Sequence, residues 1–157
     1  MEYRKEINMK KYTKTLIKIS FILYLLLLSW IIVLKFRLNL NDLKYIRSIN
    51  LIPFKANTIK ETLVNLITFI PLGMYLQYLF KDKKALNILI IILTSLFYEI
   101  LQYIFHIGIS DITDIIMNTT GGIIGVLSIK ENNQLKKILE ITLIMLPFII
   151  LLMLFLI

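Results

Sequence analysis

The chain has 157 residues, of which 58% are hydrophobic, and its formal net charge is +8. A soluble domain is about 45–50% apolar, so this composition excludes an ordinary soluble fold and indicates a protein whose apolar surface is covered by lipid. The absence of cysteine also excludes a disulfide framework or a thiolate metal site. The basic residues flank apolar runs, which is typical of contact with anionic lipid and predicts no nucleic-acid partner.

Five apolar stretches approach the roughly 20 residues that a helix needs to cross a bilayer. They run over residues 16–34, 63–80, 85–107, 112–129 and 138–157. We therefore predict an all-α, polytopic transmembrane helix bundle with about five spans, forming a single domain over residues 1–157. A basic segment follows the first stretch in place of a small-residue cleavage site, so we interpret that stretch as an uncleaved anchor.

The distribution of lysine and arginine predicts the orientation of the chain in the membrane. With the N-terminus inside, twelve basic residues lie on the cytoplasmic side and six lie on the other, all six in the 35–60 loop. Basic residues in short segments tend to stay in the cytoplasm. The pattern predicts a multi-pass protein with a cytoplasmic N-terminus and an external C-terminus.

The external loop 35–60 contains an apolar centre, Ile49-Asn50-Leu51-Ile52-Pro53-Phe54. Pro53 disfavours helix in the residue before it and indicates an extended or turn conformation. Such a segment either lies in the membrane interface or folds back over the bundle.

Polar side chains within the spans form a candidate ligand-binding cluster. Intramembrane charges are costly and usually face the bundle interior or a wet cavity. The polar residues of the third span are three residues apart and so lie on one face of that helix. Those of the fourth span are spaced by three and four residues and also share one face of their helix. The predicted topology brings all of them to roughly one depth near the external surface. The cluster comprises Asn65, Thr68, Glu99, Gln102, Asp111, Asp114 and Asn118.

Several of these positions also have a purely structural interpretation. Asp111 precedes an apolar helix, as a capping carboxylate does. Gly121 and Gly125, with Gly122 between them, form a G-x-x-x-G pattern that lets another helix approach closely. Pro71 and Gly73 interrupt the second span, where a proline bends a helix. This bend either serves packing or widens a cavity under the cluster.

Three sequence blocks together resemble the VanZ family. They cover about half of the chain in the order the family shows, but Gly108 stands where many members carry an arginine. The blocks are Asn50-Leu51-Ile52-Pro53-Phe54, the segment from Asn65 to Gly73, and the segment from Glu99 to Gly122 that begins Glu99-Ile100-Leu101-Gln102.

The resemblance implies a protein of the bacterial cytoplasmic membrane and cell envelope, linked to low-level resistance against teicoplanin and related lipid-tailed glycopeptide antibiotics. It implies no agreed biochemical activity. We expect no cofactor and no catalytic or metal-ligating set, and the sequence leaves the oligomeric state open.

Three functions fit the cluster. In the first, the cluster binds or modulates an envelope lipid, a peptidoglycan precursor or the antibiotic. In the second, Glu99 and Asp114 are an acid/base pair of an intramembrane enzyme, or the carboxylates hold Mg²⁺ or Ca²⁺. In the third, the polar residues only join helices, which yields about 0.6 kcal/mol per hydrogen bond. An ion path is disfavoured because the acids gather at one depth.

Overall fold

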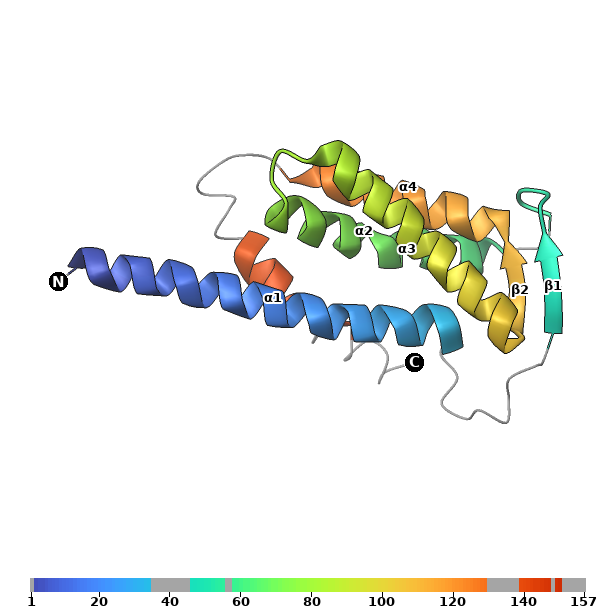
Figure 1. The fold of residues 1–157 in the computed structure, drawn as a ribbon, viewed down its shortest axis with the longest axis horizontal. Coiled ribbons are helices and arrows are strands. Elements are labelled where there is room, and N and C mark those ends of the chain that lie inside the picture. The colour runs from blue at the N-terminus through green and yellow to red at the C-terminus, as the bar shows by residue number, and fades with distance from the viewer. Residues whose placement is uncertain (1, 35–45, 56–57, 130–138, 148, 151–157) are drawn as a thin grey trace. The chain divides into compact units, whose positions relative to one another are not determined.

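The computed structural model describes residues 2–34, 46–55, 58–129, 139–147 and 149–150. Its helices are α1 (Glu2–Leu34), α2 (Ile59–Leu79), α3 (Lys84–Phe105) and α4 (Ile112–Ser128), and residues 139–147 and 149–150 are also helical. Two strands, β1 (Ile46–Asn50) and β2 (Ile107–Asp111), complete the described elements (Figure 1). The predicted all-α bundle is confirmed, with these two short strands as an addition that the sequence did not indicate.

The predicted span boundaries agree with the second, third and fourth helices to within four residues. The first helix begins at Glu2, well before the predicted start, because its polar leading residues also favour helix. Parts of the 35–60 loop and of the fifth predicted span lie outside the described residues.

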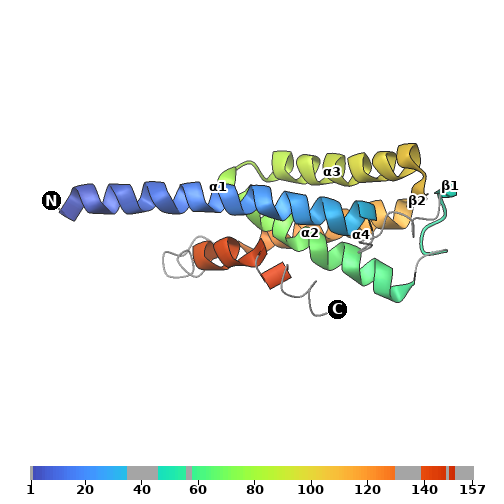
Figure 2. The same ribbon diagram turned by 90° about the horizontal axis from the view of Figure 1, so that it is seen from below.

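The chain forms two compact units, one of residues 1–28 with 130–157 and the other of residues 29–129. In the first, Ile17, Tyr24 and Leu28 are buried on one face of α1, together with Ser20. The Ser20 hydroxyl donates to the carbonyl of Leu143 at 2.6 Å. Figure 2 accordingly shows the C-terminal helical segment beside the first part of α1.

The second unit contains β1, α2, α3, β2 and α4. The two strands pair in parallel, from Ile46 opposite Ile107 to Asn50 opposite Asp111. Parallel strands need a crossover connection, which the α2–α3 helical hairpin supplies. Thr58 begins α2 with a capping box that includes Glu61, which satisfies two backbone N–H groups at the helix start.

Helices α2 and α4 run parallel and pack closely (Figures 1 and 2). A Cβ added at Gly121 would collide with the carbonyl oxygen of Leu66, and one at Gly125 would collide with that of Ile70. A Cβ added to Gly73, the α2 glycine, would meet the backbone of Gly122. The glycines thus allow backbone-to-backbone approach, the arrangement that a G-x-x-x-G pattern favours in lipid. Pro71 lies inside α2 and is buried.

Among the described residues, three helical segments are long and apolar enough to cross a membrane: Lys11–Ile32, Ile59–Leu79 and Lys84–Phe105. At about 1.5 Å per residue, the 22 residues of α3 extend roughly 33 Å, which matches the hydrocarbon core of about 30 Å. Helix α4 has 17 residues and extends only about 26 Å. Strand β2 connects the long helix to the short one.

Candidate functional site

Strand β2 folds back along the end of α3. The Ser110 hydroxyl donates to the backbone carbonyl of Glu99 at 2.8 Å, and the Asp111 backbone N–H donates to the Glu99 carboxylate at 2.9 Å. Glu99 lies six residues before Phe105, the last residue of α3, which is roughly 9 Å along the helix axis. Helix α4 therefore begins about 9 Å short of that end of α3, level with Glu99.

This geometry places non-helical backbone beside the last two turns of a helix long enough to span the membrane. In lipid, such backbone is tolerated only where protein or a water-filled cavity satisfies its polar groups. Strand β1 pairs with one edge of β2 from Ile107 to Asp111, and on other sides β2 contacts α3 and α4, with the Asp111 N–H bonded to Glu99. The strand pair thus has a physical reason to exist beside the helices.

Asp111 organises the point where β2 becomes α4. One carboxylate oxygen accepts from the Thr113 backbone N–H at 2.7 Å and caps the helix. The other accepts from the side-chain amide of Asn50 at 2.7 Å. Only 3% of Asp111 is exposed, so both contacts are made away from solvent. An acid at a helix N-terminus also interacts favourably with the helix dipole.

The segment after β1 is fixed to the start of α4. The Asn50 side-chain oxygen accepts from the Ile52 backbone N–H at 3.2 Å, which makes a local turn. The Phe54 backbone N–H donates to the Thr113 hydroxyl at 2.9 Å. Phe54 has a φ of 58°, an uncommon conformation for a bulky residue, which the neighbouring contacts hold in place.

A second contact between α3 and α4 lies deeper. The Asn118 amide donates to the Ser95 hydroxyl at 3.0 Å, and both residues are fully buried. Glu99 follows Ser95 by four residues and Asp114 precedes Asn118 by four, so the antiparallel register puts the two acids at one level. Glu99 is 4% exposed and Asp114 is 6% exposed. The two carboxylates therefore share one buried layer between α3 and α4.

The amide groups of the site use their donors within the protein. Gln102 donates its side-chain N–H to the carbonyl of Ile32 at 2.9 Å, while Asn50 and Asn118 donate as described above. In the described part of the chain, the side-chain oxygens of Gln102 and Asn118 are buried without a hydrogen-bond partner. These two oxygens can accept a hydrogen bond from a group that donates, such as a hydroxyl, an amide N–H or an ammonium.

Asn65 and Thr68 lie further along the bundle than the acids. The contact of Gly121 with Leu66 sets the register of the parallel helices, so Thr68 is level with about residue 123 of α4. This level is nine residues, or roughly 13 Å, beyond Asp114. The Thr68 hydroxyl donates to the carbonyl of Val64 in its own helix at 2.8 Å. Asn65 is half-buried on the same helix.

Comparison with known proteins identifies the family. The VanZ/LLP1 family model matches residues 21–139. Protein VanZ of Enterococcus faecium is 41% identical over 122 residues, which cover 73% of this chain and 76% of that protein. The chain belongs to the VanZ/LLP1 family. No solved structure matches it.

In this VanZ-family protein Gly108 lies opposite Arg47 in the register of β1 and β2. The Asp111 carboxylate, three residues after Gly108, accepts hydrogen bonds from the Asn50 amide and the Thr113 backbone N–H.

Three further residues of the cluster in this VanZ-family protein were not among the predicted ones. The Asn50 amide donates to Asp111, and the Ser95 hydroxyl accepts from Asn118. The Thr113 hydroxyl accepts from the Phe54 backbone N–H and so holds the loop that carries Asn50. Ser95 had a signal in the sequence, because it lies four residues before Glu99 and so on the same helical face. The roles of Asn50 and Thr113 depend on the strand pairing, which no local pattern indicated.

The described residues contain no group of three or more histidine, cysteine, aspartate or glutamate side chains that could hold a metal ion. Glu99 and Asp111 instead meet through a carboxylate–backbone hydrogen bond. Magnesium and calcium favour six or more oxygen ligands, so the described carboxylates lend no support to that alternative.

Proposed function

We propose that this protein is a multi-pass protein of the bacterial cytoplasmic membrane that confers low-level resistance to teicoplanin and related lipoglycopeptides. The carboxylate–amide cluster of α3, β2 and α4 would bind or modulate an envelope lipid, a peptidoglycan precursor or the drug. Membership of the VanZ/LLP1 family and the 41% identity to Protein VanZ support the resistance part of this proposal.

The observation that carries the binding part is the burial of three carboxylates around a strand that folds back beside a membrane-length helix. Glu99, Asp111 and Asp114 are each at most 6% exposed. Hydrogen bonds between membrane helices return only about 0.6 kcal/mol on average, while a charge at membrane depth costs several times more. Helix association alone is therefore a poor reason to bury these acids, and ligand binding is a better one.

The unpartnered side-chain oxygens of two amides indicate which chemical groups the ligand carries. With acceptors left over at Gln102 and Asn118, the cluster suits a molecule rich in hydroxyl and N–H donors. Sugar and peptide groups of a cell-wall precursor or a glycopeptide have this character.

The proposed orientation puts the cluster near the outside. The turn with Lys81, Lys83 and Lys84 joins α2 to α3 at the opposite end of the hairpin from β2. If the N-terminus is cytoplasmic, this lysine-rich turn also lies on the cytoplasmic side of the membrane. Because the chain lacks cysteine, a single-cysteine variant Lys60→Cys should react with a membrane-impermeant maleimide in intact cells, and Lys84→Cys should react only after lysis. The reverse pattern would overturn the orientation.

Drug susceptibility tests the resistance proposal. Expression in a susceptible host should raise the inhibitory concentration of teicoplanin but not that of an unrelated drug, and vancomycin provides a comparison without a lipid tail. Asp114→Ala should abolish the increase while the protein remains in the membrane at wild-type abundance. Ile116→Ala, an exposed position on the same helix, is the matched control and should keep the increase. An unchanged teicoplanin value with well-expressed wild type would refute the proposal.

The alternative is an intramembrane enzyme acting on a lipid-linked envelope substrate. The observation that favours it is the common level of Glu99 and Asp114, where burial can separate two carboxyl groups into acid and base. Glu99→Gln keeps an oxygen acceptor for the Asp111 N–H but cannot transfer a proton. An enzyme should lose resistance with this variant and show a modified lipid extract only with wild type. A binding protein should leave the lipid extract unchanged in both.

A further inference from the structure

The turn that follows β1 exposes large apolar side chains. The exposed fractions are 74% for Leu51, 55% for Ile52 and 61% for Phe54, with Pro53 between them also exposed. Surface turns of soluble domains are rich in polar residues, and a run of exposed apolar residues marks an interaction surface. We refer to Leu51–Phe54 as the apolar turn.

The apolar turn has a defined shape, because its polar atoms are used against α4. The Asn50 side chain bonds to Asp111 and to the Ile52 N–H, and the Phe54 N–H bonds to Thr113. The backbone of the turn is thus fixed to the helix start while its apolar side chains stay exposed. Such an arrangement presents a preformed apolar surface at the end of the bundle.

Helix α2, the next helix in the chain, also exposes an apolar face. Ile59, Leu63 and Ile67 are 81%, 49% and 58% exposed and are spaced by four residues, so they form one exposed stripe. Helix α2 is long and apolar enough to cross a membrane, and such a stripe faces lipid. The apolar turn lies just before the start of this stripe, where the head-group region of a bilayer would begin.

Two exposed lysines accompany the apolar turn. Lys55 follows it directly and Lys60 lies in the first turn of α2. The nearby acid Glu61 accepts hydrogen bonds from Thr58 in the capping box. Apolar side chains next to lysines are the composition that binds the interface of a membrane with anionic lipids.

We propose that the apolar turn inserts into the head-group region of the leaflet next to the start of α2, with Lys55 and Lys60 against the phosphates of anionic lipids. The notion that this loop folds back over the bundle is less suitable, because its apolar side chains would then be covered by protein. The proposal does not depend on the drug or precursor suggested above.

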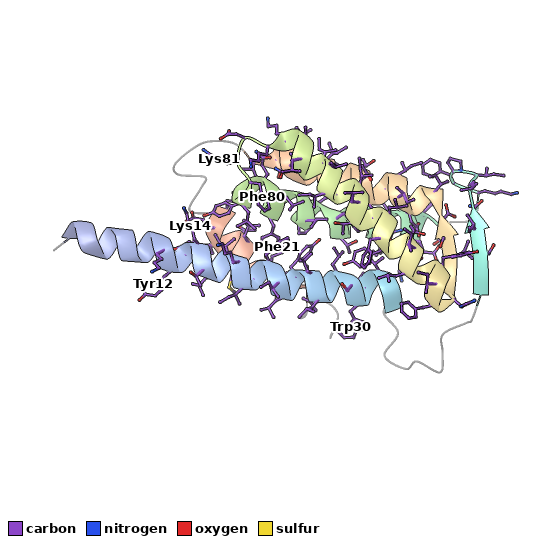
Figure 3. All side chains as sticks on the ribbon, viewed as in Figure 1. Tyr12, Lys14, Phe21, Trp30, Phe80 and Lys81 are labelled. Atoms are coloured by element: carbon purple, nitrogen blue, oxygen red, sulfur yellow. The ribbon has the colours of Figure 1, made fainter. Side chains whose placement is uncertain are left out.

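Tryptophan fluorescence in reconstituted membranes tests the insertion. Trp30 is the single tryptophan, and Figure 3 shows it on the side of α1 that faces away from α3, so Trp30→Phe provides a suitable background. In that background Phe54→Trp reports on the turn, and Leu63→Trp is the matched control within the span. The membranes are phosphatidylcholine vesicles with and without phosphatidylglycerol.

Insertion predicts that Phe54→Trp emits at shorter wavelength than tryptophan in buffer and is several-fold less quenched by acrylamide. Lipids brominated near the head group should quench it more strongly than lipids brominated at mid-chain, and Leu63→Trp should show the opposite order. Long-wavelength emission with full acrylamide quenching would overturn the proposal. So would short-wavelength emission without quenching by either brominated lipid, because protein would then cover the turn.

A separate measurement tests the contact of Lys55 and Lys60 with anionic lipids. Phosphatidylglycerol should increase the head-group quenching of Phe54→Trp, and the additional changes Lys55→Gln and Lys60→Gln should remove that increase without altering quenching in pure phosphatidylcholine. Equal quenching in both membranes before the lysines are changed would overturn the anionic-lipid contact. Emission that shifts with protein density at constant lipid composition would show a second copy of the chain to be the occupant and would likewise refute the proposal.

Discussion

Exchanging the two partners of the Asn50–Asp111 hydrogen bond tests the geometry of the site. In the wild type, Asn50 accepts from the Ile52 N–H and donates to Asp111, whose second oxygen accepts from the Thr113 N–H. With Asp111→Asn alone, the new amide needs its oxygen for Thr113, so its NH₂ group faces the NH₂ group of Asn50. Rotating the Asn50 amide would relieve that clash but would break its bond to Ile52.

Asp111→Asn should therefore lower the free energy of unfolding by the contribution of one hydrogen bond to a charged group, about 1.5–3 kcal/mol. Asn50→Asp alone should cost at least as much, because two carboxylates would lie where the donor and acceptor are now 2.7 Å apart. The double variant reverses donor and acceptor and keeps these three bonds, and it loses only the exposed 3.2 Å bond from the Asn50 amide to the Ile52 carbonyl. It also keeps one carboxylate at the site, so it should recover stability to within about 1 kcal/mol of wild type.

Thermal unfolding in a mild detergent measures the effect through the loss of a monodisperse gel-filtration peak. For a chain of this length about 1 kcal/mol corresponds to roughly 2–4 °C, so the single variants should fall by roughly 3–12 °C. The double variant should return close to the wild-type midpoint. Additive losses in the double variant would refute the assigned hydrogen bonds. An Asn50→Asp variant with the thermal midpoint of the wild type would also refute the assigned hydrogen bonds.

Three other substitutions test the helix contacts and helix ends. Gly121→Ala should cost about 1–3 kcal/mol in the same assay, because its methyl group meets the carbonyl of Leu66, whereas Ile124→Ala at an exposed position of α4 should change little. His106→Gly should raise the free energy of unfolding by up to about 1 kcal/mol, since His106 ends α3 in the left-handed region with a φ of 58°. A lower thermal midpoint would contradict this reason. Thr58→Ala should cost about 1 kcal/mol by removing the capping box of α2, and Thr58→Ser should keep it.

Some features of the site are set by local sequence and could be anticipated. Helical periodicity places Glu99 and Gln102 on one face of α3, and Asp111, Asp114 and Asn118 along the start of α4. Asp111 before an apolar run has the chemistry of a helix cap, and the structure shows that bond. These features require only the spacing of residues a few positions apart.

Other features depend on residues distant in the sequence. The approach of Asn50 to Asp111 follows from the pairing of β1 with β2, two five-residue segments on either side of the α2–α3 hairpin. Each strand has five residues, of which only two are isoleucine and the rest are not β-branched or aromatic, so the local signal for a strand is weak. The separation of Thr68 from the acids depends on the register of α2 against α4, which is fixed by glycine contacts between the backbones.

The sequence alone determined that the chain is an apolar helical membrane protein, because its composition and the length of its apolar runs require lipid and suit membrane-crossing helices. Its three sequence blocks resembled the VanZ family, and the family model confirms this. The sequence also determined which residues are polar within the spans. Only the tertiary structure decided that β2 turns back beside Glu99 and that Asn50 and Thr113 complete the hydrogen bonds of Asp111. The physical reason is that backbone at membrane depth must find partners, and those partners come from parts of the chain that no local pattern connects.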